Sequence, residues 1–157
     1  MYYKFENKIK MSTRIKILDA NSASYKAMMS LEMTLQTTSL SDIQKELIKT
    51  RASQINQCAF CLDMHTKDAI KYGETPQRLF LLNAWRETDL FTEEEKVILA
   101  MTEEITLISQ KGLTDETYEK ATQLFDEEQI KSIIMAVITI NMWNRIAIST
   151  HLQIPKN

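Results

Sequence analysis

The sequence predicts an all-α fold, a single-domain bundle of about seven helices. The chain has 157 residues, enough to bury a hydrophobic core without disulfide cross-links. It contains two Gly and two Pro, too few for a turn-rich β sandwich or a glycine-rich phosphate-binding loop. No repeat, low-complexity tract or flexible linker divides it, so we expect one domain over residues 19–157. Residues 1–18 are expected to form an N-terminal extension, irregular or a short strand.

The composition also narrows the function. With 44% hydrophobic and 25% charged residues, the chain has the balance of a folded globular protein. Its 19 basic and 21 acidic residues give a net charge of −2, which does not indicate a nucleic-acid partner. The N-terminus lacks the apolar core of a signal peptide, and no uncharged apolar stretch has the length of a membrane span. We therefore expect a soluble cytoplasmic protein that binds neither nucleic acid nor membranes.

Capping residues predict the first two helices. Asn21 or Ser22 begins a helix that runs to about Gln36. The segment Ser41–Gln44 is a capping box, in which the first and fourth residues satisfy each other's backbone N–H groups. It predicts a second helix, which continues to about Ile55.

The third and fourth helices are bounded by Gly and Pro. A helix from Cys58 to Tyr72 is expected to end at Gly73, which readily adopts the left-handed conformation of a C-terminal cap. Pro76 suits the first turn of the next helix, because a backbone N–H at that position would have no partner within the helix. This fourth helix is expected to run to about Glu87.

The last three helices follow further caps. Thr92–Glu95 is a second capping box, and the helix behind it is expected to continue to Gly112. Thr114 and Asp126 cap the last two helices. The final helix, roughly 127–150, is apolar on several sides, so it is expected to lie at the centre of the bundle or at a subunit interface.

The segment from Cys58 to His65, Cys-Ala-Phe-Cys-Leu-Asp-Met-His, carries the clearest chemistry of the chain. At about 100° per residue, Cys61 lies roughly 60° and His65 roughly 20° from Cys58 around the helix axis. All three side chains therefore project from one face of the predicted helix, toward the interior or a pocket in it.

This helix favours a reactive thiolate. Cys58 stands at the helix start, where the backbone dipole favours negative charge, and His65 follows Cys61 by one turn and can accept or pass a proton. Two sulfurs three residues apart can also close a disulfide with little backbone movement. The arrangement suits a redox cycle in which a thiolate is oxidised to a sulfenic acid and the neighbouring Cys condenses with it.

Other interpretations of the pair stay open. Cys58, Cys61, His65 and the distant His151 are the soft ligands available for a zinc site. The cysteines could also be inert core residues capped by the histidine. A thioredoxin-like site is disfavoured because no βαβ pattern surrounds the motif. Apart from these sites, His151 is expected to be a solvated cap near the end of the last helix.

The segment Ile55–Ala69 resembles the core motif of the alkylhydroperoxidase D-like (carboxymuconolactone decarboxylase-like) family. The family pattern is a Glu, then CxxC, then a His four residues after the second Cys, and Glu46 stands twelve residues before the first Cys, as that pattern has it. The similarity runs from about Met11 to Ile154 and includes three further segments, Arg51–Ser53, Ala84–Thr88 and Asn141–Arg145.

The resemblance implies an all-α fold assembled into trimers or hexamers, which reduces peroxides without metal, flavin or haem and is re-reduced by a dithiol protein. By this analogy Cys61 is the attacking thiol and Cys58 is its proton donor and resolving partner. Glu46 and His65 complete the proton relay. Phe60 stands where alkylhydroperoxidase D itself has a second His, so one relay residue is missing. The decarboxylase branch lacks the cysteine pair, which disfavours lactone decarboxylation.

Without the resemblance, Glu46 would be assigned as a solvated surface charge, because it stands among lysines. Arg51 and Arg145 are expected to pair with acids between helices. The two Trp and nine Met are expected to serve core and interface packing rather than a cofactor site.

Two function classes compete on this basis. The first is a thiol-dependent peroxidase or thiol-disulfide oxidoreductase that uses the redox-active pair Cys58 and Cys61. The second is a redox-sensing or thiol-disulfide exchange module, with little peroxidase turnover, whose disulfide alters subunit packing.

Overall fold

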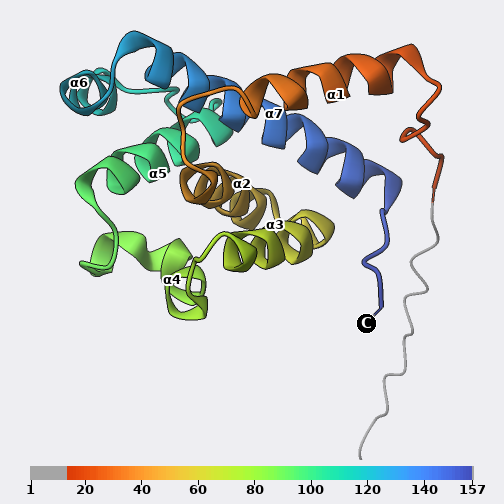
Figure 1. The fold of residues 1–157 in the computed structure, drawn as a ribbon, viewed down its shortest axis with the longest axis horizontal. Helices are drawn as coiled ribbons and strands as arrows, with labels where there is room; N and C mark the ends of the chain where they lie inside the picture. Colours follow the sequence, from red (N-terminus) through yellow and green to blue (C-terminus); the bar gives the residue numbers. More distant parts are fainter. Residues whose placement is uncertain (1–13, 157) are drawn as a thin grey trace, which may run out of the picture.

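The computed structural model describes residues 14–156 and has seven α-helices and no strand in that range (Figure 1). The all-α prediction is confirmed. Part of the expected N-terminal extension lies outside the described residues, and residues 14–18 are irregular, as expected. The elements are α1 (Ala23–Leu35), α2 (Asp42–Asn56), α3 (Ala59–Lys71), α4 (Pro76–Leu81), a 3-10 helix (Leu82–Glu87), α5 (Glu93–Thr106), α6 (Asp115–Leu124) and α7 (Glu127–Thr150).

The helix starts follow the predicted caps. The side chains of Ser22, Ser41, Thr92 and Asp126 each accept a hydrogen bond from a backbone N–H in the first turn of their helix. Both predicted capping boxes are present, and Asp126 with Gln129 forms a third. These caps satisfy donors that have no partner within the helix, so they fix where each helix begins.

The expected single helix over 76–87 is wrong, because α4 ends at Leu81 and a 3-10 helix follows. Residues three apart lie on the same side of a 3-10 helix. This geometry turns both Leu82 and Trp85 into a small core cluster with Leu47, Phe91 and Leu99.

The expected continuation of the fifth helix to Gly112 is also wrong. α5 ends at Thr106, and the next two residues, Leu107 and Ile108, are exposed, so no apolar contact there supports a further helical turn. Gly112 adopts a φ of +68° in the turn that leads toward α6, a conformation suited to glycine.

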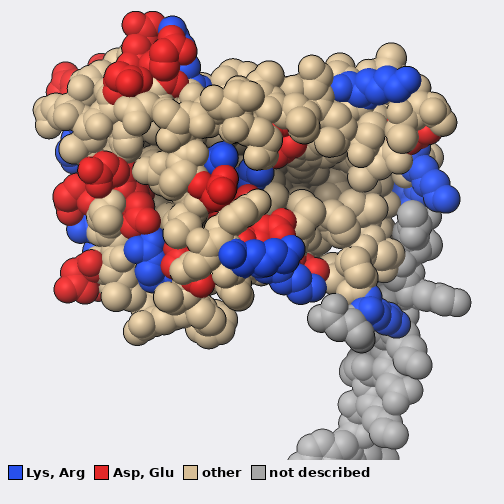
Figure 2. Space-filling model, viewed as in Figure 1, with Lys and Arg blue, Asp and Glu red and all other residues tan. Residues whose placement is uncertain are grey.

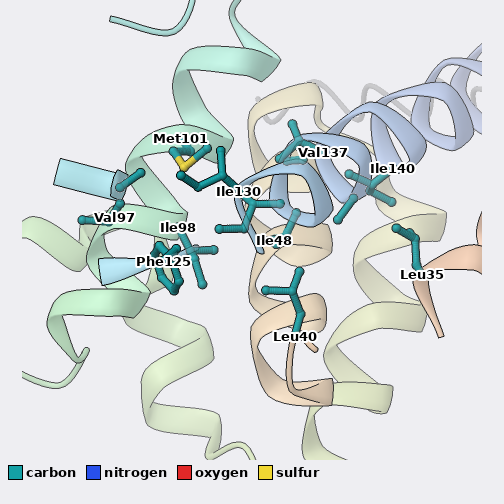
Figure 3. Close-up of a cluster of buried hydrophobic side chains, with 14 of the residues drawn as sticks. Leu35, Leu40, Ile48, Val97, Ile98, Met101, Phe125, Ile130, Val137 and Ile140 are labelled. Carbon is teal, nitrogen blue, oxygen red and sulfur yellow. The ribbon is translucent and has the colours of Figure 1, made fainter. Parts of the chain in front are cut away.

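The main core lies between α2, α5 and α7 (Figure 3). α7 contacts α1, α2, α3, α5 and α6, which confirms that this apolar helix is central. By length and composition alone, α7 is the one helix of the described residues that could cross a membrane, but half of its most apolar stretch is buried within the fold. Fully buried side chains of the core include Ile48, Ala52, Ile98, Met101, Ile133 and Val137.

A buried polar network joins the end of α2 to α7, directly before the cysteines. The Asn56 amide donates hydrogen bonds to the side-chain oxygens of Asn141, at 3.0 Å, and Asn144, at 2.9 Å. The Asn144 amide in turn donates to Ser53 Oγ at 3.0 Å. Because an unpaired buried amide is costly, this network holds the last turn of α2 in one position on α7.

One of the two expected arginine pairings is present. Arg51 Nε contacts Glu103 Oε1 at 2.8 Å and links α2 to α5, as predicted. Within residues 14–156 Arg145 pairs with no acid, and its guanidinium donates instead to the backbone and side-chain oxygens of Asn141, one turn earlier in α7.

Glu103 is expected to make the fold sensitive to acid. Burial by itself raises the pKa of this carboxyl, but hydrogen bonds from Arg86, Trp85 and Arg51 outweigh burial and hold the pKa below its ordinary value of 4.5. A carboxyl with a lowered pKa stabilises the fold above its unfolded-state pKa and loses that contribution as the pH falls through the folded-state value. We therefore expect the free energy of unfolding, measured in urea, to fall more steeply below about pH 4.5 in the parent than in Glu103→Gln. The same pH dependence of the unfolding free energy in the parent and in Glu103→Gln would contradict a lowered pKa for Glu103.

Candidate active site

The chain reverses between α2 and α3 so that the cysteine pair begins a helix. Gln57, the C-cap of α2, adopts a left-handed conformation with a φ of 57°. Cys58 follows as the N-cap of α3, and its backbone N–H donates to Ser53 O at 3.0 Å. α2 and α3 therefore pack side by side, with the CxxC segment at the junction (Figure 1).

The structure joins Cys58 and Cys61 in a disulfide, with Cα atoms 5.4 Å apart. The two residues are buried, with exposed fractions of 1% and 2%. Both also belong to the main core cluster, so little of either residue is open to solvent. The spacing predicted from the sequence thus gives a closed pair on the first turn of α3.

Glu46 and His65 meet beside this pair. His65 Nδ1 lies 2.8 Å from Glu46 Oε2, and both residues are buried. The carboxylate comes from the middle of α2 and the imidazole from α3, one turn after Cys61. A carboxylate bonded to one ring nitrogen fixes the orientation of the imidazole and leaves the other nitrogen for proton transfer.

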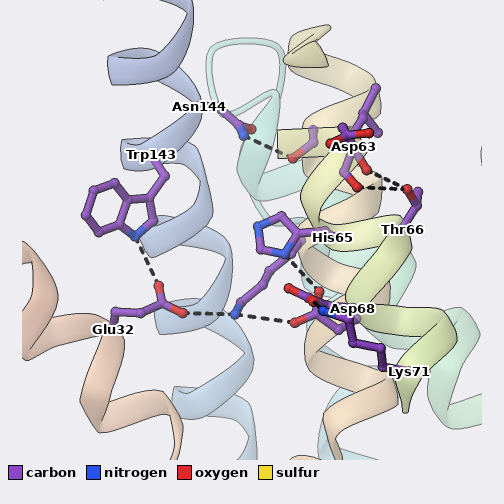
Figure 4. Close-up of polar contacts among 12 residues, drawn as sticks. Glu32, Asp63, His65, Thr66, Asp68, Lys71, Trp143 and Asn144 are labelled. Atoms are coloured by element: carbon purple, nitrogen blue, oxygen red, sulfur yellow. Dashed lines mark hydrogen bonds and ion pairs between the residues drawn. The ribbon is translucent and has the colours of Figure 1, made fainter. Parts of the chain in front are cut away.

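The buried Lys49 connects the His65–Glu46 pair to Glu32 of α1, and Figure 4 shows Glu32 beside Trp143 of α7. Lys49 Nζ lies 3.5 Å from Glu46 Oε1 and 2.9 Å from Glu32 Oε1, and Glu32 also accepts a hydrogen bond from Trp143 Nε1 at 3.0 Å. Burial by itself lowers the pKa of Lys49, but the two carboxylates outweigh burial and raise it. The lysine is therefore a fixed positive charge beside Glu46.

Cys61, His65, Glu46 and Lys49 all line one cavity of about 380 Å³. The space lies between α1, α2, α3 and α7, and Figure 2 shows the surface hollowed there. Phe60, the residue in the place of a second relay histidine, also lines it. Most of the other lining side chains are apolar or aromatic, among them Tyr25, Met29, Met64, Ile140 and Trp143.

The four predicted site residues therefore come together, although not in equal ways. Cys61, His65 and Glu46 face the same cavity, whereas Cys58 does not line it and reaches it through the disulfide. Glu32, Lys49 and the polar role of Trp143 were missed by sequence reasoning. Glu46 and Lys49 are three residues apart on α2, a spacing that predicts a contact. No spacing rule connects them to Glu32 on α1 or to Trp143 on α7, so the sequence held no signal for those contacts.

The four ligands of the alternative zinc site do not meet at one point. His65 lines the large cavity, while His151 lines a separate one. A different cluster, formed by Glu46, His65 and Asp68, has its ligand atoms within 4.8 Å of one another. Lys49 already supplies a positive charge to Glu46, so a metal ion at this cluster would have to displace the Lys49–Glu46 ion pair.

A model of the carboxymuconolactone decarboxylase family matches residues 22–104 of the chain. The chain belongs to this family. A relative from Bacillus subtilis, the uncharacterised protein YdfG, is 44% identical over 139 residues, which cover 88% of this chain and 95% of YdfG. Residues 22–104, which the family model matches, contain the whole CxxC region and Glu46.

Solved structures agree with this family fold. A protein of unknown function from Agrobacterium tumefaciens, described as a candidate antioxidant defence protein AhpD, superposes with a TM-score of 0.88 at 38% identity, over 93% of this chain and all of that one. An uncharacterised peroxidase-related protein from Silicibacter matches with a TM-score of 0.72 at 25% identity, over 82% of this chain and 69% of its own. The debrominase Bmp8 has a TM-score of 0.74 at 17% identity, over 83% of this chain and 70% of its own, which is a likeness of fold alone. The chain thus has the AhpD-like all-α fold and carries the CxxC pair.

Proposed function

We propose that the protein is a thiol-dependent peroxidase of the cytoplasm that uses Cys61 as its peroxide-reactive thiol. The observation that carries this proposal is the convergence of Cys61 and the buried His65–Glu46 pair on one largely apolar cavity. A thiol is nucleophilic as its thiolate, so it needs a proton acceptor nearby, and the cavity brings the His65–Glu46 pair together with Cys61. The antioxidant and peroxidase-related descriptions of two similar structures point to the same class of reaction.

The proposed cycle has two steps. In the first, the Cys61 thiolate attacks one peroxide oxygen, the O–O bond breaks, and the leaving oxygen takes a proton held by His65. This step oxidises Cys61 to a sulfenic acid and releases an alcohol or water. In the second, the sulfur of Cys58 attacks Cys61, the disulfide forms and water leaves. Glu46 holds the imidazole in place throughout, and Lys49 fixes Glu46.

A complete cycle requires a dithiol reductant, and we propose a dithiol protein as the partner. We also propose that the chain forms a homo-oligomer, a trimer or hexamer. Exposed apolar side chains on α3 and α4 support this, since Ile70 is 49% and Phe80 is 78% exposed. Size-exclusion chromatography with light scattering tests it, and a monomer at micromolar concentration would contradict it.

The competing function is a redox sensor or thiol-disulfide exchange module with little turnover. The pair sits on the first turn of α3, the helix that also exposes Ile70, so closing or opening the disulfide could change how copies pack. This alternative predicts that oxidation changes the oligomeric state while peroxide consumption stays negligible. The peroxidase proposal predicts sustained peroxide consumption with no change in the oligomeric state on oxidation.

Mass spectrometry after peroxide treatment tests the proposed order of events. Reduced parent protein, given one equivalent of hydrogen peroxide, is expected to gain a Cys58–Cys61 disulfide. Cys58→Ser, treated in the same way with a sulfenic-acid trap, is expected to carry the trap on Cys61, because no resolving thiol is present. Unmodified cysteines in both proteins would contradict the peroxidase proposal.

A further inference from the structure

A second cavity lies on the other side of the disulfide. It has a volume of about 200 Å³ and is lined by Cys58, which is absent from the larger cavity that Cys61 lines. Three residues, Phe60, Ala147 and Leu152, line both cavities and so form the wall between them. The two cysteines of one disulfide therefore border separate spaces.

The smaller cavity carries its own proton-transfer group. His151 lines it, and among the residues that the structure places around it His151 is the one with a side chain that can accept a proton while the disulfide is closed. The hydrogen bonds of His151 within residues 14–156 are made by its backbone, at the C-cap of α7. The prediction that His151 is a helix cap is thus confirmed, and the residue also borders a cavity that Cys58 lines.

The backbone around this cavity is held in an uncommon conformation. Gln57 and His151 are the two non-glycine residues with a positive φ in the described chain, at 57° and 53°. Both line the smaller cavity. Glycine would be more stable at such helix ends, and left-handed conformations of larger residues concentrate at functional sites.

We propose that the oxidised protein is reduced through this smaller cavity, by attack of an uncharged dithiol on Cys58 with His151 as the base. This inference rests on the proposed function, because it concerns the step that returns the oxidised peroxidase to its reduced form. The lining has no charged side chain among the described residues, and a space of this size admits a slender thiol-bearing chain rather than a folded surface. Peroxide and reductant would then use different entrances.

Reduction consists of two thiol-disulfide exchanges at Cys58. In the first, His151 takes the proton of one reductant thiol, the resulting thiolate bonds to Cys58 Sγ, and the Cys58–Cys61 bond breaks. The electron pair passes to Cys61, which leaves as the thiolate that starts the next cycle. In the second, the other reductant thiol gives its proton to water and attacks the first reductant sulfur, so the reductant leaves as a disulfide. Cys58 departs as a thiolate and takes the proton held by His151.

A single-exchange trap tests the direction of attack. The disulfide is formed with diamide, the protein is exposed briefly to 2-mercaptoethanol, and the mixture is quenched in acid for tandem mass spectrometry. The adduct is expected on Cys58, and an adduct on Cys61 would overturn the proposal. Diamide replaces peroxide in this test, so the outcome is separate from whether the protein is a peroxidase.

Variants test the cavity and the histidine. His151→Gly suits the left-handed cap and keeps the fold, and it is expected to slow reduction by dithiothreitol about tenfold, with added imidazole restoring the rate. Ile148→Trp, at the smaller cavity, is expected to slow reduction, whereas the matched Met64→Trp, at the larger cavity, is not. An unchanged rate in His151→Gly, or slowing by Met64→Trp alone, would overturn the proposal.

Discussion

Cys61→Ser is expected to abolish peroxide consumption, with a loss of at least about 1,000-fold. A hydroxyl is not appreciably ionised at neutral pH and cannot pass through a sulfenic acid, so neither step of the cycle remains. The change removes one buried sulfur from the first turn of α3 and leaves the His65–Glu46 pair in place. The measurement is the initial rate of peroxide loss with dithiothreitol as the reductant.

The control is Cys58→Ser, which keeps the attacking thiol and removes the resolving one. It is expected to consume about one equivalent of peroxide and then stall unless an added thiol reduces the sulfenic acid directly. Both variants must retain the helical circular-dichroism signal of the parent. Peroxide turnover that survives in Cys61→Ser while being lost in Cys58→Ser would reverse the assignment of the two thiols.

Glu46→Gln is expected to slow oxidation of the protein about 100-fold, an effect on the barrier of about 2.7 kcal/mol. The amide keeps the shape of the side chain but removes the charge that fixes the imidazole at 2.8 Å. It also leaves Lys49 with one carboxylate instead of two, so some loss of stability accompanies the change. At a temperature where the variant stays folded, the oxidation rate is still expected to be about 100-fold lower than in the parent, so the loss of stability does not explain it.

Glu32→Gln is the matched control for this prediction. Like Glu46→Gln, it removes one of the two carboxylates that contact Lys49, but Glu32 does not contact His65. We expect a similar loss of stability with a change of less than about fivefold in the oxidation rate. Rates that fall equally in the two variants would assign Glu46 a structural role only. The measurement is stopped-flow oxidation of the pre-reduced proteins under excess peroxide.

Local rules predicted most of the fold and failed where the tertiary structure intervened. The caps at Ser41, Thr92 and Asp126 place their helices because each satisfies a backbone donor within a few residues. The bend after Leu81 was missed because it serves the burial of Trp85 against residues far away in the sequence. The early end of α5 was missed because the exposure of Ile108 is decided by packing.

The candidate site divides in the same way. The spacing of Cys61 and His65 fixes their common face, because both lie within α3. The expectation that Cys58 shares this face is wrong, because Cys58 is the N-cap of α3, has an extended backbone and lines a different cavity. Glu46 was found through family resemblance, since its lysine neighbours in the sequence suggest an exposed charge.

Only the tertiary structure could show that Lys49 also pairs with Glu32, because that contact crosses from α2 to α1. Only the tertiary structure could also show that Cys61 and Cys58 border two different cavities. Cavities are formed by side chains from several elements, and their walls depend on how α3 and α7 pack, which no local pattern specifies. The sequence by itself thus determined where the helices begin and the spacing of the cysteine pair, and the packing of the helices determined which cavity each cysteine borders.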